Sequence, residues 1–251
     1  MQQSSRMRGW IKSAFDLALI LLAVTAAKTA IAEPFYIPSG SMEPTLLIGD
    51  QLLATKYPYG YSTASLPAFI VLPGTTRIMG ALPQRGDVVV FRYRGDRSQT
   101  WVKRVIGLPG DRVALRDGRV SINGTPVGIR SAGVGQAEIE DGSTMPAAHF
   151  IETLPGEREH SIFKLVARGS YDDMPETVVP RDHLFVMGDN RDNSADSRVK
   201  VADGGVGMLP VENLIGRVDG IIGSWDLAAK RQPIWTWASG LRLARFFSAI
   251  N

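Results

Sequence analysis

One stretch in the middle of the chain decides the fold class: Arg112-Val-Ala-Leu-Arg-Asp-Gly-Arg-Val-Ser-Ile-Asn-Gly-Thr-Pro-Val-Gly-Ile129. Two dipeptides in it, Asp117-Gly118 and Asn123-Gly124, favour the tight two-residue turns of β-hairpins. The residues between these turns are mostly apolar or β-branched, as expected for short strands. The stretch is therefore predicted to form a three-stranded antiparallel meander.

The same pattern extends along most of the chain. Turn signals such as Gly49-Asp50 and Gly86-Asp87 separate short apolar runs, and clear strand signals return at residues 183–187 and 217–222. Strands do not alternate with helical patterns, which argues against a parallel α/β sheet. Residues 130–180 differ, because Gly, Pro, Ser and acidic residues interrupt their apolar pieces. That segment is either a smaller β-rich subdomain or one long excursion.

The composition excludes several classes of protein. The net charge of the 251 residues is only +3 and no five basic residues occur in a row, so nucleic-acid binding has little electrostatic support. Cysteine is absent, which excludes a disulfide framework and a thiolate metal site.

The N-terminus contains an apolar run that follows several basic residues. Residues 15–32 would form a helix roughly 27 Å long, just enough to cross a bilayer. The positive-inside rule places residues 1–14 in the cytoplasm and the rest of the chain outside. A cleaved secretory signal fits these residues equally well, because Ala30-Ile31-Ala32 matches a cleavage site.

The C-terminal segment, residues 231–251, is predicted to be amphipathic. From Trp235 onward its spacing is helical, with apolar residues including Leu243, Phe247 and Ile250 on one face. Such a helix would pack on the body of the protein or rest on the bilayer surface.

Two serines immediately follow the apolar N-terminal run. Pro38 and Gly40 flank Ser39 and Ser41, and Pro44 prevents extension of the turn. A turn of this kind can hold a hydroxyl and backbone N–H groups in the fixed geometry that an oxyanion hole needs. On its own, a Ser-Gly-Ser turn is usually only a turn.

A lysine in an apolar strand is the candidate base. In an extended strand, Lys103 shares one face with Trp101 and Val105, while Arg104 lies on the other. Removal of water disfavours the ammonium form and lowers the pKa of a lysine, which can then accept a proton near neutral pH. The alternative is an ordinary edge-strand lysine whose ammonium reaches solvent.

A polar loop, residues 187–198, follows the strand at 183–187. Its side chains suit a network of hydrogen bonds within the loop. A calcium loop is the alternative, with Asp192, Ser194 and Asp196 at alternating positions, but Ser197 stands where that motif needs glycine.

Histidine does not offer a catalytic pattern. The three histidines are too scattered for a metal pair, and His149 and His160 are expected at the surface. A serine enzyme built from this chain would need another base, and serine–lysine pairs are a recognised arrangement.

Five stretches, in this order, resemble the motifs of bacterial type I signal peptidases: Pro38-Ser-Gly-Ser-Met-Glu-Pro-Thr-Leu46, Lys56-Tyr-Pro-Tyr-Gly60, Arg85-Gly-Asp-Val-Val-Val-Phe91, Val102-Lys-Arg-Val-Ile-Gly-Leu-Pro-Gly-Asp111 and Gly188-Asp-Asn-Arg-Asp-Asn-Ser-Ala-Asp-Ser-Arg198. The resemblance covers residues 15–111 and 183–220 well and 130–180 poorly. One departure is the glycine-rich stretch Val199–Gly207, which is longer here than in the family.

The resemblance implies a role for each matching residue. Ser41 would be the nucleophile and Lys103 the general base, Ser39 and the Ser41 N–H would stabilise the oxyanion, and Ser194 would orient Lys103. The residues that would support the polar loop at 187–198 are Asp189, Asn190, Arg191, Asp196 and Arg198. Residues that would bind substrate are Phe35, Ile37, Pro38, Met42, Leu46, Val90, Trp101 and Val102. No metal or organic cofactor is implied.

The resemblance also implies an architecture and a location. It predicts a mainly β protein, in which a large antiparallel catalytic domain (33–129 and 181–230) is interrupted by a smaller β-rich subdomain (130–180). It favours a retained single transmembrane anchor at 15–32 in the cytoplasmic membrane, with the catalytic domain on the periplasmic side.

The implied activity is removal of signal peptides from exported preproteins after Ala-x-Ala, at the bilayer and near the secretion translocon. The alternatives are a dedicated Ser–Lys maturation peptidase of a conjugation or pilus system, and a non-catalytic extracytoplasmic β-rich binding module.

Overall fold

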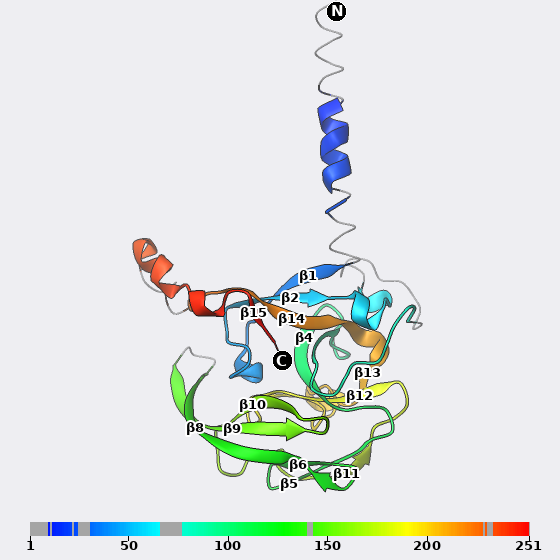
Figure 1. Ribbon diagram of the computed structural model, residues 1–251, viewed down its shortest axis with the longest axis vertical. Coiled ribbons are helices and arrows are strands. Elements are labelled where there is room, and N and C mark those ends of the chain that lie inside the picture. The colour runs from blue at the N-terminus through cyan, green and yellow to red at the C-terminus, as the bar shows by residue number, and fades with distance from the viewer. Residues whose placement is uncertain are drawn as a thin grey trace, which may run out of the picture.

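The computed structural model describes residues 10, 12–21, 23–24, 31–65, 77–139, 143–227, 229 and 233–250. Its body consists of antiparallel sheets joined by turns and short 3-10 helices (Figure 1). The predicted mainly β, antiparallel architecture is therefore confirmed.

The largest sheet holds eight strands. They run in the order β1-β2-β14-β3-β4-β12-β13, and β15 pairs with β14 beside this path. Their bounds are β1 (Ala32–Tyr36), β2 (Asp50–Thr55), β3 (Val88–Arg92), β4 (Thr100–Gly107), β12 (His183–Met187), β13 (Leu209–Pro210), β14 (Leu214–Ser224) and β15 (Ser248–Ala249). The strand predicted at 183–187 is confirmed.

The large sheet is buried on both faces around its centre. Val88 and Val90 of β3 belong to one apolar cluster, whereas Val89 and Phe91 belong to another. Successive side chains of a strand point to opposite faces, so a run of apolar residues indicates a strand covered on both sides. This rigid centre carries the residues of the candidate site.

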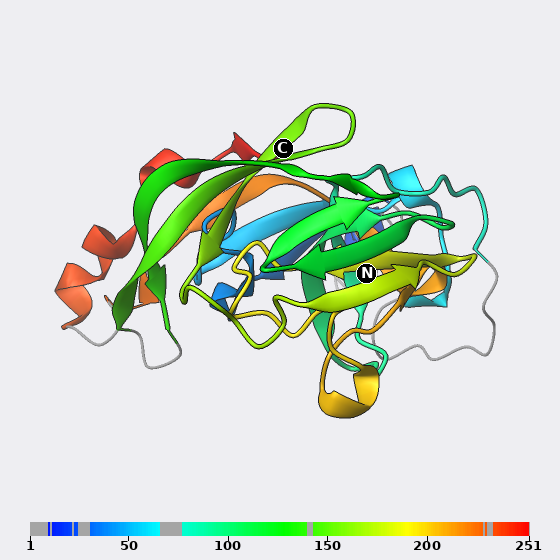
Figure 2. The same ribbon diagram turned by 90° about the horizontal axis from the view of Figure 1, so that it is seen from below.

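Two smaller sheets lie against the large one (Figure 2). One has the order β11-β5-β6-β7, with β5 (Arg112–Arg116), β6 (Arg119–Ile122), β7 (Thr125–Pro126) and β11 (Met174–Val178). The other has the order β10-β9-β8, with β8 (Gly128–Glu138), β9 (Thr144–Leu154) and β10 (Arg158–Lys164).

The predicted meander is confirmed by the pairing of β5, β6 and β7. Its turns have positive φ at both central residues, 49° and 76° at Asp117-Gly118 and 53° and 80° at Asn123-Gly124. Positive φ at both positions defines the type I′ turn, which matches the twist of the flanking strands.

The boundaries of the proposed subdomain do not coincide with sheet edges. β11 lies within residues 130–180, yet it pairs with β5, which belongs to the segment 33–129. The division of the chain into two domains therefore stays a prediction.

Seven short 3-10 helices connect the strands in the described part of the chain. They are η1 (Gly40–Met42), η2 (Tyr57–Tyr59), η3 (Thr63–Ser65), η4 (Val201–Asp203), η5 (Val211–Asn213), η7 (Ile234–Gly240) and η8 (Leu243–Arg245).

The predicted C-terminal helix is wrong. Residues 234–249 form η7, η8 and β15 instead, and Phe247 has a φ of 58°, which a right-handed helix does not allow. Leu243 and Phe247 are exposed, while Ile250 packs on the core, so the expected apolar face does not exist. Pairing of Ser248 and Ala249 with β14 outweighs the helical spacing of the sequence.

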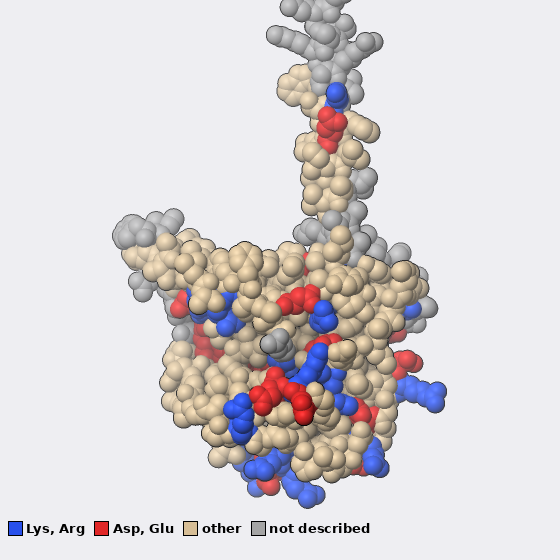
Figure 3. Space-filling model, viewed as in Figure 1, with Lys and Arg blue, Asp and Glu red and all other residues tan. Residues whose placement is uncertain are grey.

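The described N-terminal residues are helical from 12 to 21 and stand clear of the body in Figure 1. Their apolar side chains are exposed. The charged residues of this helix are Lys12 and Asp16, and most of the segment that rises above the body in Figure 3 is uncharged. Among the described residues, no helix has both the length and the apolar character that a bilayer span requires.

Part of the predicted anchor at 15–32, residues 22 and 25–30, lies outside the described residues. Its end needs correction, because Ala32 begins β1 and pairs with Thr55 of β2.

Candidate active site

The turn between β1 and β2 presents Ser41. Ser41 lies in the middle of η1, whose preceding residue Ser39 is extended, with φ −132° and ψ 152°. The turn is anchored to the strands on both sides, because Ile37 N–H donates to Asp50 O at 3.0 Å and Gly49 N–H donates to Ile37 O at 2.9 Å. We call residues 39–43 the nucleophile turn.

Lys103 reaches this turn from the centre of β4. Its Nζ donates to Ser41 Oγ at 2.9 Å and to Val102 O at 3.1 Å. Ser39 Oγ lies 3.4 Å from Ser41 Oγ. The structure thus brings Ser39, Ser41 and Lys103 together. Ser39 and Ser41 are 2 positions apart in the chain, whereas Ser41 and Lys103 are 62 positions apart.

Burial changes the acidity of Lys103. Its side chain is 4% exposed, and this loss of water lowers its pKa to about 8. Asp196 and Asp189 act in the opposite direction by stabilising the ammonium, and Arg198 adds to the lowering. A lysine with this pKa is partly neutral near neutral pH, and can accept the proton of a hydroxyl at 2.9 Å.

A cavity of about 550 Å³ opens beside Ser41 and Lys103. Five of the eight predicted substrate-binding residues line it: Ile37, Pro38, Met42, Trp101 and Val102. Phe35, Leu46 and Val90 do not, because they pack in the core cluster beneath. The lining residues that the sequence analysis missed are Tyr36, Gln99, Thr100 and Ala195. Ala195 lies within the motif Gly188–Arg198, and the other three lie within three positions of a motif, which is the only signal that could have identified them.

The indole of Trp101 forms one wall beside the lysine. It stacks on Tyr93 with ring centroids 4.1 Å apart, and its own ring lies 5.5 Å from Lys103 Nζ. The stacked pair holds an apolar surface next to the ammonium group, which limits the access of water to it.

The loop after β12 is tied to both catalytic segments. Asp189 pairs with Arg104 at 2.8 Å and accepts a hydrogen bond from Thr45, which follows the nucleophile turn. Asn190 N–H donates to Ser41 O at 3.2 Å. These contacts fix the loop against the residues that carry Ser41 and Lys103.

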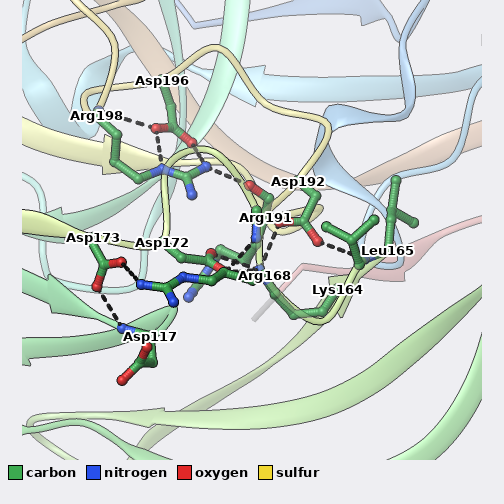
Figure 4. A network of polar contacts seen from close by, with 12 residues as sticks. Asp117, Lys164, Leu165, Arg168, Asp172, Asp173, Arg191, Asp192, Asp196 and Arg198 are labelled. Carbon is green, nitrogen blue, oxygen red and sulfur yellow. Dashed lines mark hydrogen bonds and ion pairs between the residues drawn. The ribbon is translucent and has the colours of Figure 1, made fainter.

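Asp196 and Arg198 form a buried pair within this loop. Arg198 Nε donates to Asp196 Oδ1 at 2.8 Å, and Gly188 N–H donates to Asp196 Oδ2 at 3.0 Å (Figure 4). The glycine-rich stretch Val199–Gly207 folds back onto this pair, because both Val199 and Val206 donate their N–H groups to Asp196 O. The longer loop therefore packs on the site.

Ser194 is buried in the loop, but among the described residues no hydrogen bond joins its Oγ to Lys103 Nζ. Both Ser194 and the nucleophile turn pack closely against Gly188. A Cβ added at Gly188 would lie 2.3 Å from Ser194 Oγ and 2.4 Å from Ser41 O.

Replacing Gly188 with alanine is therefore expected to displace Ser194 or the nucleophile turn. A misplacement of about 1 Å near reacting groups can reduce kcat by about 100-fold. Steady-state cleavage assays check this expectation. Gly128→Ala is the matched control, because a Cβ there meets only ordinary contacts, 3.4 Å or more away. Equal activity of the two variants would contradict the expectation.

A second buried cluster supports the loop from β9 and β10. Arg191 Nη1 donates to Glu152 Oε1 at 2.8 Å, and both residues are 1% exposed. His160 Nε2 lies 3.2 Å from Glu152 Oε2. The expected surface position of His160 is wrong, because it is 6% exposed; burial lowers its pKa.

His149, also expected at the surface, is half-buried and packs edge-on against Phe163 with ring centroids 5.5 Å apart. Nothing in the sequence pattern identified these buried positions, because the partners of both histidines come from other elements.

The two aspartates considered as calcium ligands, Asp192 and Asp196, form ion pairs with a lysine and an arginine of the protein. Asp192 pairs with Lys164 at 2.7 Å and accepts the Leu165 N–H at 2.7 Å, while Asp196 pairs with Arg198 (Figure 4). Within the described part of the chain, no group of three or more His, Cys, Asp or Glu residues is arranged to hold a metal ion.

The chain is similar in sequence to known proteins. A family model described as signal peptidase, peptidase S26, matches residues 7–225. Signal peptidase I of Rickettsia typhi is 36% identical over 251 residues, which cover 92% of this chain and 90% of that protein. Signal peptidase I of Pseudomonas aeruginosa is 36% identical over 85% of this chain and 72% of its own length.

Among solved structures, a signal peptidase I from Enterococcus faecalis covers 55% of this chain and 97% of its own, with 24% identity and a TM-score of 0.32, too loose a likeness to support an inference. The family match and the curated relatives span most of the sequence, and the chain belongs to the signal peptidase family, peptidase S26.

Proposed function

We propose that this serine peptidase is a membrane-anchored endopeptidase that removes signal peptides from exported preproteins. The observation that carries the proposal is the 2.9 Å contact between Lys103 Nζ and Ser41 Oγ at the edge of a cavity. The names of the relatives, signal peptidase I, supply the class of substrate.

The reaction starts with neutral Lys103. Its Nζ takes the proton of Ser41, and Oγ attacks the carbonyl carbon of the scissile peptide. The resulting oxyanion accepts hydrogen bonds from the Ser41 N–H and the Ser39 hydroxyl. The lysine then gives its proton to the leaving amine, and the acyl-enzyme forms. A water molecule, deprotonated by Lys103, hydrolyses the acyl-enzyme and restores Ser41.

The buried loop sets the position and acidity of the base in this mechanism. Asp189 and Asp196 stabilise the ammonium that forms when Lys103 takes a proton, while Ser194 packs behind the nucleophile turn. The roles of all these residues rest on the family resemblance and on the contacts described above.

Specificity for small residues comes from the cavity. Ile37, Met42 and Val102 give it an apolar surface, which suits an alanine side chain. Cleavage after Ala-x-Ala follows, because two small side chains would enter this surface.

The exposed apolar helix at 12–21 supports an anchor of which residues 15–31 are the apolar part. Enzyme and signal peptide then share one bilayer, which raises their effective concentration. The proposed location is the cytoplasmic membrane, with residues 1–14 inside and the catalytic domain on the periplasmic side, near the secretion translocon.

Cleavage of a preprotein by the full chain tests the proposal. The wild-type protein is expected to cut after the second alanine of Ala-x-Ala, and replacement of that alanine with leucine should slow cleavage at least about 100-fold. The rate should rise as pH increases through about 8, because only neutral Lys103 is a base and its pKa is lowered to about 8. Cleavage that ignores the alanine would contradict the proposed specificity.

A further inference from the structure

Glu43 is a buried carboxyl two residues after the nucleophile. It is 1% exposed and closes the nucleophile turn, where its own N–H donates to Gly40 O at 3.1 Å. Its Oε2 accepts a hydrogen bond from the N–H of Glu138 at 3.0 Å. Glu138 is the last residue of β8, 95 positions further along the chain. This contact ties the turn to a distant strand.

The end of β8 also lies directly against Gly40. A Cβ added at Gly40 would be 3.0 Å from Glu138 O and 3.2 Å from Glu43 Cδ. Figure 1 shows the ends of β8 and β9 reaching toward the segment between β1 and β2. Gly40, the residue before Ser41, is therefore covered by the backbone of Glu138 at the end of β8. The same Glu138 is the hydrogen-bond partner of Glu43.

The same three-stranded sheet contacts the loop on the other side of the site. Glu152 of β9 forms the buried pair with Arg191, and Phe163 of β10 exchanges backbone hydrogen bonds of 2.9 Å with Asp189 and Arg191. A single sheet therefore fixes both the nucleophile turn and the loop that surrounds Lys103. At the nucleophile turn, the Glu43 carboxyl accepts the N–H of Glu138.

We propose that Glu43 is a positioning residue, which fixes the nucleophile turn by holding the end of β8 against Gly40. Its effect on turnover rests on the proposed peptidase function, whereas the contact itself does not. Glu43 touches no reacting atom, and it acts through Gly40 and Ser41.

The charges around Glu43 make this contact sensitive to pH. The groups that face it are Glu138 of β8, Asp50 of β2 and Arg242 of the C-terminal segment. Burial raises the pKa of Glu43 to about 7; Glu138 and Asp50 add to the rise, and the Glu138 N–H and Arg242 oppose it. An ionised carboxylate here regains water only if the end of β8 moves away. The contact is therefore tightest below about pH 4.5, the ordinary pKa of a hydrated glutamate, and loosens as pH rises to about 7.

Amide exchange of Glu138 in the full chain, purified in detergent and resolved to single residues, tests the contact directly. Glu43→Met removes the acceptor and should speed exchange of that amide about tenfold at pH 6. Glu43→Gln keeps an acceptor oxygen and cannot ionise. After correction for intrinsic rates, protection should fall between about pH 4.5 and 7 in the wild type and stay constant in Glu43→Gln. Glu176→Gln, an exposed change on β11, is the matched control and should behave as the wild type does.

Cleavage of the Ala-x-Ala preprotein supplies the second readout. Glu43→Met should lower kcat about tenfold with little change in KM, and Glu43→Gln should restore kcat at pH 6.5. The wild-type profile should carry an inflection near pH 7 that Glu43→Gln lacks, while both keep the rise near pH 8.

The two hypotheses fail separately. If Glu43→Met exchanges and cuts as the wild type does, the positioning role is wrong although the peptidase is active. If exchange changes as expected and no variant cuts a preprotein, the proposed function is wrong and the contact stands. Unchanged protection in Glu43→Met would overturn the inference even if that variant were less stable, because a folded chain that lacks the acceptor must lose this hydrogen bond.

Discussion

Replacing Lys103 with methionine is expected to reduce kcat by about 10⁴-fold, because the chain then lacks the proposed general base for Ser41. Methionine has a similar length and keeps the buried site apolar, so folding should be retained. Ser41→Ala should cause a loss of similar size. The double variant should be little worse than either single one, because the two residues act as a unit.

Two further variants show which property of Lys103 matters. Lys103→Arg keeps the positive charge, but a guanidinium stays protonated and cannot act as a base, so the same loss is expected. Lys200→Met removes an exposed lysine from the loop after Arg198 and should leave kcat unchanged. Preprotein cleavage under single-turnover conditions is the measurement. Substantial activity of Lys103→Arg would show that charge, not proton transfer, is the role of the lysine.

Removal of Asp189 is expected to destabilise the fold by about 3–5 kcal/mol, since it removes the carboxylate that pairs with the buried Arg104 guanidinium. Both side chains are 1% exposed, and their oxygen and nitrogen atoms are 2.8 Å apart. Burial acts to raise the pKa of Asp189, but Arg104 outweighs it and holds that pKa below its usual value. The stabilising effect is therefore present at neutral pH and is lost as pH falls through the lowered pKa.

Urea unfolding of Asp189→Ala, followed by tryptophan fluorescence, measures this loss. Asp173→Ala is the control, because Asp173 and its partner Arg168 are exposed, at 52% and 74%, and water screens their attraction. A chain with both Arg104→Met and Asp189→Leu should recover much of the stability, because both charges of this pair are then removed together. If Asp189→Ala unfolds at the same urea concentration as Asp173→Ala, the pair does not stabilise the fold in this way.

The parts of the fold that could be predicted are those encoded by neighbouring residues. Asp117-Gly118 and Asn123-Gly124 determine their turns through local backbone preference, so the meander followed directly from the sequence. The strand at 183–187 could be located because its residues are buried on both faces. The contact between Ser41 and Lys103 was expected from motif order alone, and the structure places the two atoms within hydrogen-bond distance.

The features that could not be predicted depend on partners far away in the chain. Residues 235–251 have helical spacing, but pairing of Ser248 with Ile221 of β14 determines their structure. His160 resembles a surface residue until Glu152 and Asp189 surround it. Glu43 looks like an ordinary turn residue, and its burial is caused by Glu138, 95 positions away. Local propensity carries no information about such partners.

The position of β14 in the large sheet has a consequence for biosynthesis. It lies between β2 and β3, so the strands next to Ser41 and those next to Lys103 are joined through a segment that starts only at Leu214. Until that segment has left the ribosome, the two halves of the sheet have no strand between them. A nascent or truncated chain that lacks β14 is therefore expected to be inactive, and activity should begin only after Leu214–Ser224 has been made.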